Sequence, residues 1–287
     1  MNSGNNQLGM VVEGGGVRAI YVAGVLDVLH DLHLPLAGVI GVSAGAIHSC
    51  SFVAGQQGRS IRYYKKYSPQ KRFFNLKSWI TTGNIVDNRF CYHDIHRTLD
   101  PFDNEAFMAS PTKFYVTCSN VETGRAEYLH ISDFFSDQID LLRASASLPY
   151  FSRIVEYDGM KLLDGGCTDP IPLKAFEAMG YNKNIVVMTQ PRTHRKKDRD
   201  AMLARWLYGR YPKFCEAFEN CPQHYEETLE YIDEQERKGN VFVIRPDQAI
   251  DISRLTHDPE KIQYGYDLGR SHALARVEAL KAWLNAI

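Results

Sequence analysis

The chain has 287 residues, a length that fits one large α/β domain or one domain with an elaborated C-terminal part. Hydrophobic residues make up 44% and charged residues 23%, which excludes a largely disordered chain. The 33 basic and 34 acidic side chains give a formal net charge of -1, so the chain lacks the positive field that generic nucleic-acid binding requires.

The ends and the cysteines predict a cytoplasmic protein. Residues 1–7 have neither the basic start nor the apolar run of a secretory signal. The six cysteines form no CxxC pair, which argues against a zinc site and for a reducing compartment. The most apolar stretch, 34–55, contains Pro35, His48 and several glycines. We therefore expect a strand, a tight turn and a buried helix there, and no membrane span.

The first half of the chain predicts two parallel βα units. Residues 8–13 (LGMVVE) form an apolar run that ends in three glycines, after which apolar residues recur at helical spacing up to residue 29. Residues 36–41 (LAGVIG) predict a second buried strand. The small, apolar segment 44–54 follows with almost no loop and predicts a second helix.

The remaining elements predict one covered sheet. We interpret the aromatic and charged segment 59–107 as helices and loops that form one wall of a pocket. Further strands are predicted at 113–118, 125–131, 160–163, 184–189 and 241–244, with helices at 138–147 and 259–284. Strands that alternate with helices indicate a three-layer α/β/α architecture with a mostly parallel central sheet. We expect a catalytic core at 8–172, and a C-terminal extension at 173–287 that completes the sheet and adds helices.

The first chemical motif is G-x-S-x-G, from Gly41 through Ser43 to Gly45, between an apolar strand and an apolar helix. The two glycines allow a sharp turn that presents the serine oxygen above the sheet at a helix N-terminus. The pattern alone is weak, because it recurs by chance. Its position between strand and helix makes Ser43 a candidate nucleophile.

The second motif is the run Gly14, Gly15, Gly16, which also follows a strand directly. Consecutive glycines let backbone N–H groups point at one spot, where they can stabilise the oxyanion of an acyl-transfer intermediate. The same run, with Ala19, also fits a dinucleotide-binding loop, G-x-G-x-x-G/A. That alternative needs an acidic residue near the end of the second strand, where Ser43 and its flanking residues stand instead.

The third motif is Asp164-Gly165-Gly166, at the end of the apolar segment 160–163. A carboxylate beside two glycines is free of side-chain crowding, so it can approach Ser43 and accept its proton. Taken alone, the pattern is typical of an Asp-Gly turn. The other two motifs favour the catalytic interpretation.

The three motifs in this order resemble the patatin-like phospholipase family, and its bacterial members most closely. The resemblance covers residues 8–172 and includes the small-residue block 144–151 (ASASLPYF) before a proline and aromatics. It implies a Ser43–Asp164 dyad that cleaves a carboxylic ester of a lipid through an acyl-enzyme. The loop of Gly14, Gly15 and Gly16, with the Ala44 N–H, would form the oxyanion hole.

The same resemblance assigns Arg18 as the basic residue of the glycine loop, with no metal and no cofactor required. The sequence departs from the family at Ala19, where many members have glycine, and at Pro170, where many have asparagine. These changes concern loop geometry and leave the dyad in place. Since an aspartate with an ordinary pKa of about 3.9 is a weak base, the dyad depends on close geometry and oxyanion stabilisation.

Two other functions remain open from the sequence. A Ser-Asp-His esterase could use His257 or His272, which follow Asp164 in the α/β-hydrolase order. A non-catalytic protein of this fold could bind lipid or a nucleotide. Peripheral membrane contact is a further expectation, because the basic stretch 191–199 precedes a series of apolar side chains: Met202, Leu203, Trp206, Leu207, Tyr208, Tyr211 and Phe214.

Overall fold

Eight strands form one central sheet among the residues that the computed structural model describes, which are 7–70, 72–195, 201–253 and 255–286. They are β1 (Leu8–Val12), β2 (Gly38–Val42), β3 (Lys113–Asn120), β4 (Arg125–Ile131), β5 (Val155–Tyr157), β6 (Met160–Asp164), β7 (Lys183–Val187) and β8 (Val241–Ile244). The order is β5-β6-β3-β2-β1-β7-β8, and β4 also pairs with β3. The pairs that involve β1, β2, β7 and β8 are parallel, and those of β3 with β4, β3 with β6 and β5 with β6 are antiparallel.

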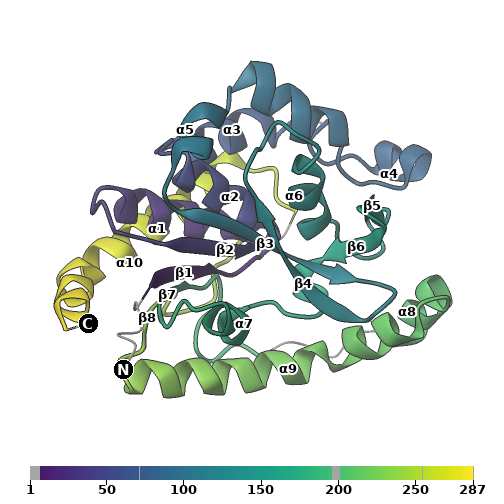
Figure 1. Cartoon of the computed structure of the whole chain (residues 1–287). Helices are drawn as coiled ribbons and strands as arrows, with labels where there is room; N and C mark the ends of the chain where they lie inside the picture. The colour runs from purple at the N-terminus through teal and green to yellow at the C-terminus, as the bar shows by residue number, and fades with distance from the viewer. Residues whose placement is uncertain (1–6, 71, 196–200, 254, 287) are drawn as a thin grey trace.

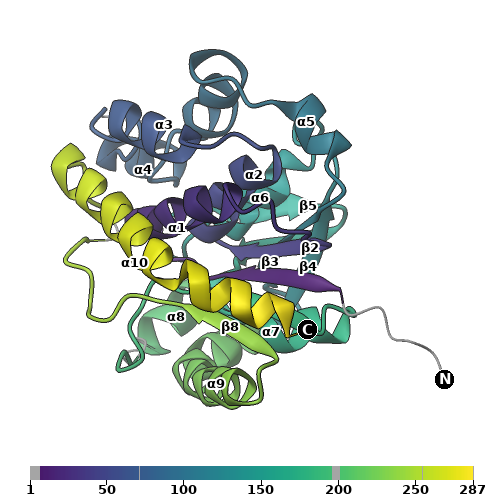
Figure 2. The ribbon, with the colours of Figure 1, turned by 90° about the vertical axis from the view of Figure 1, so that its left-hand side faces the viewer.

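Helices cover both faces of this sheet. They are α1 (Ile20–His30), α2 (Ala44–Val53), α3 (Arg59–Tyr67), α4 (Leu76–Thr82), α5 (Asn104–Ala109), α6 (Ile139–Ser145), α7 (Leu173–Ala178), α8 (Ala201–Tyr208), α9 (Pro212–Arg237) and α10 (Pro259–Asn285). Short 3₁₀ turns η1 (Gly16–Ala19) and η3 (Gly165–Cys167) and a π-helix η2 (Phe90–Leu99) complete the set. Figure 1 shows α1, α2 and α6 above the sheet and α7 and α9 below it, and Figure 2 shows the same layers from the side. The predicted three-layer architecture with a mostly parallel sheet is confirmed.

The central strands are apolar on both faces because each face packs against helices. On β1, Met10 and Val12 belong to the core that includes α1 and α10, whereas Val11 belongs to the core that includes α7 and α9. On β7, Ile185 and Val186 divide in the same way. This explains why the sequence shows continuous apolar runs rather than alternation at these strands.

One edge of β3 is shared by two strands that run toward each other. β4 pairs with residues 114–120 along the whole of the opposite edge. β2 pairs in parallel with β3 as far as Thr117, and β6 pairs antiparallel with residues 118–120. Because β4 already occupies the other side of 118–120, β6 must lie on the same side as β2. The carboxyl ends of β2 and β6 therefore meet, with Val42 level with Thr117 and Asp164 level with the next residue of β3.

Most predicted elements lie close to where the sequence placed them. The strand predicted at 36–41 is in fact Gly38–Val42, since the Leu36 N–H donates to the Leu34 carbonyl in a turn at 2.8 Å. The three-residue strand β5 was not predicted. Most of α9 was also missed, because Pro222 lies inside this helix and such a residue normally ends one.

Candidate active site

Ser43 occupies a strained turn between β2 and α2. Its backbone angles, φ 55° and ψ -129°, fall in a region that residues other than glycine rarely adopt. α2 begins at the next residue, Ala44, so the unpaired N–H groups and the positive dipole end of this helix lie beside Ser43. The serine is buried, with 7% of its surface exposed. The sharp strand-to-helix turn predicted here is present.

Three of the predicted glycines make this turn sterically possible. A Cβ atom at Gly41 would lie 2.5 Å from a backbone atom of α2, and one at Gly45 would lie 2.5 Å from the Glu13 carbonyl oxygen. A Cβ atom at Gly14 would lie 2.8 Å from Cβ of Ser43. Real Cβ atoms essentially never approach other atoms so closely. The glycine loop after β1 and the turn after β2 are therefore packed backbone against backbone.

Asp164 reaches the same place from the opposite direction. It is the last residue of β6, and only 3% of its surface is exposed. Its Oδ1 accepts a hydrogen bond from the Gly166 N–H at 2.8 Å, and its own N–H donates to the Ser147 carbonyl at 2.9 Å. A Cβ atom at Gly165 would overlap the carbonyl oxygen of Thr117. Both glycines of the predicted motif thus allow the chain to turn sharply next to the carboxylate.

The structure brings the three motifs together at one point of the sheet edge. Ser43 follows the last residue of β2, and Asp164 ends β6, whose carboxyl end meets that of β2 along β3. Gly14 packs directly on Ser43 from the neighbouring strand β1. Segments more than 100 residues apart in sequence therefore converge on one hydroxyl group and one carboxylate.

Ser145 links these segments and was not recognised individually from the sequence. Its hydroxyl oxygen accepts a hydrogen bond from the Ser43 N–H at 2.9 Å and donates one to the Thr117 carbonyl at 2.7 Å. The side chain is fully buried at the end of α6. Ser145 lies in the small-residue block 144–151, so the sequence marked its neighbourhood but not its role. It fixes the backbone of the strained residue to β3.

A buried carboxylate, Glu13, directly precedes the glycine loop and anchors it to other elements. Its Oε2 accepts hydrogen bonds from the Thr189 N–H at 2.7 Å and the Thr189 hydroxyl at 3.0 Å. Its Oε1 accepts a hydrogen bond from the Tyr225 hydroxyl at 2.9 Å. Burial and the nearby Glu13 carboxylate raise the pKa of Tyr225 far above its ordinary value, so this phenol remains a donor.

The same threonine also holds the loop directly. The Thr189 hydroxyl lies 2.9 Å from the Gly14 carbonyl oxygen, and a Cβ atom at Gly15 would lie 3.1 Å from that hydroxyl. Gly16 has a positive φ of 61°, which glycine adopts without strain. Glu13 could have been singled out from the sequence, because it is an acidic residue at the end of an apolar strand. Thr189 and Tyr225 could not be found without the fold, since they lie 176 and 212 residues away from Glu13.

Arg18 lies on η1, directly after the three glycines, and is half-buried. Its guanidinium faces the side chain of Gln190. With the carboxamide oxygen turned toward it, Gln190 accepts hydrogen bonds from Nη2 at 2.6 Å and Nη1 at 3.3 Å. The arginine therefore ties the glycine loop to the segment after β7. The supporting role that the resemblance implies for Arg18 stays a prediction.

The two histidines of the esterase alternative have contacts elsewhere in the fold. His257 lies 2.7 Å from the Ser68 carbonyl oxygen, at the end of α3, and its ring packs on Phe74. His272, on α10, lies 3.1 Å from the hydroxyl oxygen of Tyr21 on α1. A third histidine, His48, is buried in α2, and burial lowers its pKa to about 3. His48 is therefore uncharged at neutral pH.

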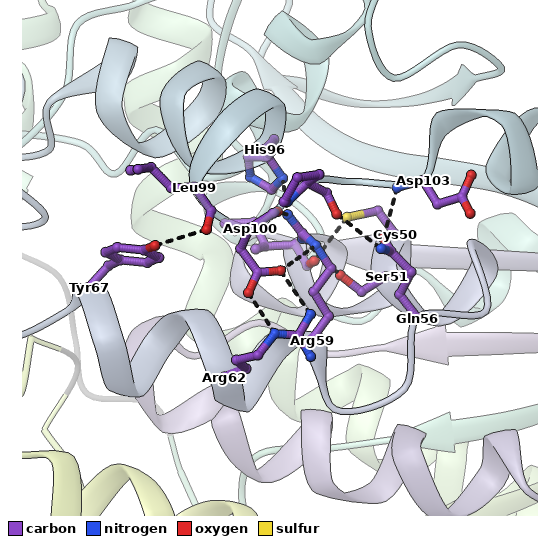
Figure 3. A network of polar contacts seen from close by, with 12 residues as sticks. Cys50, Ser51, Gln56, Arg59, Arg62, Tyr67, His96, Leu99, Asp100 and Asp103 are labelled. Atoms are coloured by element: carbon purple, nitrogen blue, oxygen red, sulfur yellow. Dashed lines mark hydrogen bonds and ion pairs between the residues drawn. The ribbon is translucent and has the colours of Figure 1, made fainter.

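A second buried polar cluster lies at the far end of α2 (Figure 3). Arg59 is fully buried, and its Nε lies 3.3 Å from a carboxylate oxygen of Asp100. Arg62 reaches the same carboxylate in a bidentate pair, with distances of 2.7 and 2.9 Å. The Arg59 Nη2 also donates to His96 Nδ1 at 3.1 Å, since an arginine has no acceptor. Burial, followed by the Arg59 charge, lowers the pKa of His96 well below its ordinary value, so His96 stays neutral.

The basic stretch 191–199, predicted to contact membranes, is partly outside the described residues, Lys196 and Lys197 included. The two arginines that are described face acidic residues of α9: Arg192 lies 2.9 Å from Asp233, and Arg195 lies 3.9 Å from Glu226. Of the apolar residues that follow, Tyr208 and Phe214 are buried in a cluster that includes Leu163 of β6 and Phe218 of α9, so they are not available for the predicted membrane contact. Those that remain exposed are Met202, Leu203, Trp206 and Leu207.

The described residues contain neither a helix that could cross a membrane nor a cluster that could hold a metal ion. None of the helices there combines the length and the apolar character that crossing a membrane requires. Within the same residues, no group of three or more His, Cys, Asp or Glu side chains is arranged to hold a metal ion.

Comparison with known families gives two matches along the chain. A family model described as patatin-like phospholipase matches residues 10–177, which contain all three motifs. A model described as a domain of unknown function matches residues 211–285, which contain α9, β8 and α10.

Individual proteins that are similar to this chain share about a quarter of its sequence or less. The chain is 25% identical to an uncharacterized protein, YjjU, of Escherichia coli over 282 residues, which cover 92% of this chain and 75% of that protein. It is 27% identical to lysophospholipase nte1 of Emericella nidulans over 179 residues, which cover 60% of this chain but only 11% of that protein. The crystal structure of VipD from Legionella pneumophila aligns over 96% of this chain and 67% of that chain, with a TM-score of 0.48 and 12% sequence identity.

Proposed function

The chain belongs to the patatin-like phospholipase family, and from this premise we propose that it is a lipid acyl hydrolase with Ser43 as nucleophile and Asp164 as general base. The observation that carries the proposal is the meeting of β2 and β6 along one edge of β3. This meeting supports the proposal because the backbones of Ser43 and Asp164 then lie at neighbouring levels of the sheet, with Gly14 packed on Ser43.

The proposed reaction has two half-reactions. In the first, the Ser43 oxygen attacks the ester carbonyl carbon while its proton passes to Asp164. The oxyanion that forms accepts hydrogen bonds from backbone N–H groups of the loop Gly14, Gly15 and Gly16 and from the Ala44 N–H. The tetrahedral intermediate then expels the alcohol, which takes the proton from Asp164, and the acyl group remains on Ser43 as an ester.

In the second half-reaction, Asp164 takes a proton from a water molecule that attacks the acyl-Ser43 carbonyl. The second tetrahedral intermediate collapses, the proton returns to the serine oxygen, and the carboxylic acid leaves. The strained backbone of Ser43 is consistent with this role, since strain of this kind clusters at functional sites. The hydrogen bond from Gly166 would keep Asp164 oriented in both half-reactions.

The substrate is proposed to be a phospholipid or a lysophospholipid, in keeping with the family description and with the name of the nte1 relative. We further propose that residues 8–172 carry the chemistry. Residues 173–287 would add β7 and β8 to the sheet and support the glycine loop through Thr189 and Tyr225. We also propose that the enzyme is cytoplasmic and contacts membranes peripherally.

A hydrolysis assay over a panel of lipids tests the proposal. The panel should contain phospholipids, lysophospholipids, glycerides and a soluble ester, with product detected by mass spectrometry. We expect release of fatty acid by the wild type and loss of at least about 10³-fold in Ser43→Ala and in Asp164→Asn. Full activity in either variant would contradict the dyad.

The same assay separates the two other functions. His257→Ala and His272→Ala should retain activity, and a loss as large as that of Ser43→Ala would favour a Ser-Asp-His mechanism instead. A wild type that hydrolyses no member of the panel, yet binds lipid or NAD(P) in a direct binding measurement, would favour the non-catalytic alternative.

A further inference from the structure

Large apolar side chains are exposed together on three segments at one end of the molecule. The segments are α4 with the two residues that follow it (76–84), the loop 150–154, and α8 with the turn after it (201–211). Ile80 is 73% exposed, and Met202 and Trp206 are each 80% exposed. The other exposed apolar residues of these segments are Leu76, Trp79, Phe151, Leu203 and Leu207. We call this region the docking surface.

Direct contacts hold the three segments together. The Trp79 indole N–H donates to the Tyr150 carbonyl at 2.8 Å, and its ring packs near that of Phe151. The Tyr150 N–H donates to the Tyr208 hydroxyl oxygen at 2.9 Å. Figure 1 shows α4 and α8 at the same end of the molecule, above and below β5 and β6. The docking surface is therefore one continuous feature.

The exposure of these side chains is not explained by the core. On α8, Ala204 and Tyr208 are one turn apart and pack inward against α9, which leaves the opposite face of the helix apolar and exposed. α4 buries none of its residues. A hollow of about 430 Å³ opens between the two helices and is lined by Trp79, Ile80, Gly83, Tyr150, Ser152, Leu207 and Tyr208. A contiguous exposed apolar patch of this kind marks an interaction site.

The charges around the docking surface identify its partner. The three segments contain four basic residues and no Asp or Glu, in a chain whose formal net charge is -1. The basic residues are Lys77, Arg153, Arg210 and Arg205, of which Arg205 is paired with Glu219 of α9 at 2.8 Å. Lys77, Arg153 and Arg210 are exposed beside the apolar side chains. Tryptophan and aliphatic side chains rimmed by Lys and Arg suit the boundary between acyl chains and anionic head groups.

We propose that the docking surface binds the surface of a bilayer that contains anionic phospholipid. The proposal rests on the proposed function for its purpose, since a lipid acyl hydrolase must reach lipids in a bilayer. It keeps the exposed apolar residues of α8 from the membrane contact predicted from the sequence. In place of the basic stretch 191–199, whose described arginines face acidic side chains of α9, it adds α4 and the loop 150–154.

The docking surface is also connected to the candidate active site through the chain. Tyr150 lies three residues after Ser147, whose carbonyl accepts the Asp164 N–H at 2.9 Å. Ser145, two residues earlier, accepts the Ser43 N–H. A bilayer bound at Trp79 and Phe151 therefore lies at the end of the segment that fixes both proposed catalytic residues. The segment 145–151 thus links the docking surface to the candidate active site.

Vesicle flotation of the full chain tests the proposal. The probes are vesicles of phosphatidylcholine alone and of phosphatidylcholine mixed with phosphatidylglycerol. We expect the wild type to float with the mixed vesicles and at least tenfold less with phosphatidylcholine alone. A triple variant, Ile80→Gln, Met202→Gln and Trp206→Gln, should reduce binding to the mixed vesicles at least tenfold, because these exposed side chains supply the apolar contact. A charge variant, Lys77→Glu, Arg153→Glu and Arg210→Glu, should remove the preference for anionic vesicles.

A matched control replaces exposed apolar residues elsewhere, Met108→Gln and Leu274→Gln, and should bind as the wild type does. Circular dichroism checks that each variant is folded. A wild type that does not float, or a triple variant that binds as tightly as the wild type, would overturn the proposal. So would concentration-dependent dimerisation that the triple variant abolishes, because the surface would then join two copies of the chain.

Activity separates this proposal from the proposed function. The ratio of vesicle-lipid hydrolysis to soluble-ester hydrolysis should fall at least tenfold in the triple variant. If the wild type binds mixed vesicles through these residues but cleaves no lipid, the docking surface is supported and the proposed hydrolase activity is contradicted. If the wild type cleaves lipid equally in both vesicle types, and the triple variant has the wild-type ratio of vesicle-lipid to soluble-ester hydrolysis, the docking surface is contradicted and the hydrolase activity is supported.

Discussion

The two ends of α2 bury polar groups by different means. At the far end, Arg59 is neutralised by Asp100 and surrounded by hydrogen-bond acceptors and aromatic rings. None of the cluster's residues has a positive φ. At the near end, Ser43 has a strained backbone and is enclosed by glycines that leave no room for a Cβ atom.

We therefore expect one end of α2 to matter mainly for stability and the other mainly for catalysis. A buried ion pair is costly to break, because the remaining charge loses both water and its partner. A tightly packed backbone holds atoms in place, and its alteration moves groups by fractions of an ångström. Changes at the Arg59 end should therefore appear in the free energy of unfolding, and changes at the Ser43 end in the rate of hydrolysis.

The largest effect is expected for Ser43→Gly. This variant should lower the rate of hydrolysis at least about 10³-fold and yet stabilise the fold. Glycine adopts the backbone conformation of this residue without strain, so the free energy of unfolding should rise by about 1 kcal/mol. Ser43→Ala is the control, because it is equally inactive and keeps the strain. Urea unfolding that finds the glycine variant less stable than the alanine variant would contradict a strained turn.

The next effect is expected for Arg59→Ala, which leaves the Asp100 carboxylate buried with a weakened set of partners. The free energy of unfolding should fall by about 3–5 kcal/mol. Arg62→Ala is the matched control, since it removes the other cation of the same carboxylate from a site that is 55% exposed and should cost about 1 kcal/mol. Equal losses in the two variants, measured by urea unfolding, would show that burial does not distinguish them.

Gly14→Ala tests the close packing of the glycine loop on Ser43. The added methyl group would push the loop away, so hydrolysis should fall by about 10²-fold through misplaced N–H donors. Gly159→Ala is the control, because no atom lies within 4 Å of its Cβ position. Its positive φ of 74° should cost about 1 kcal/mol of stability, with hydrolysis unaltered. An active Gly14→Ala enzyme would count against the oxyanion role of this loop.

Tyr225→Phe tests the support that Glu13 gives to the loop. Loss of one hydrogen bond to the buried carboxylate should lower hydrolysis about fivefold and stability by about 1 kcal/mol. Tyr231→Phe makes the same change on the same helix, where the hydroxyl bonds Glu177, and should leave hydrolysis at the wild-type rate. If both variants are equally active, α9 supports the fold but not the loop.

The last prediction concerns acid stability and His48, where hydrolysis is not affected. Burial lowers the pKa of this histidine to about 3 in the folded chain, and the ordinary value is 6.5. Because the unfolded chain binds the proton first, the contribution of His48 to stability is constant above about pH 6.5 and falls by up to about 1.4 kcal/mol per pH unit between pH 6.5 and 3. His48→Leu should make the urea midpoint fall less steeply between pH 7 and 5, with the remaining fall due in part to the buried His96, whereas a change at the exposed His33, such as His33→Gln, should leave the slope unaltered.

The parts of the fold that follow from local patterns were predictable from the sequence. Buried parallel strands are continuous apolar runs, so β1, β2, β7 and β8 could be placed to within a few residues. The glycine motifs marked the turns after β1, β2 and β6 because those turns admit no side chain. Antiparallel β5 and the Pro222-containing α9 gave no such signal.

The supporting contacts of the candidate site could not be predicted because they depend on which segments become neighbours. Ser145 bonds the Ser43 N–H across 102 residues, and Tyr225 bonds Glu13 across 212. Neither residue type is unusual where it stands in the sequence. The docking surface was predicted only in part, since α8 was marked by its apolar residues but α4 was not expected to join it.

The most direct test of the Ser43–Asp164 dyad is the rate at which a fluorophosphonate modifies the protein, followed by intact mass and peptide mapping. This measurement needs no knowledge of the natural substrate. The dyad predicts a single adduct on Ser43, no adduct in Ser43→Ala, and labelling slowed at least about 10²-fold in Asp164→Asn. An adduct on another residue, or an Asp164→Asn variant labelled at the wild-type rate, would contradict it.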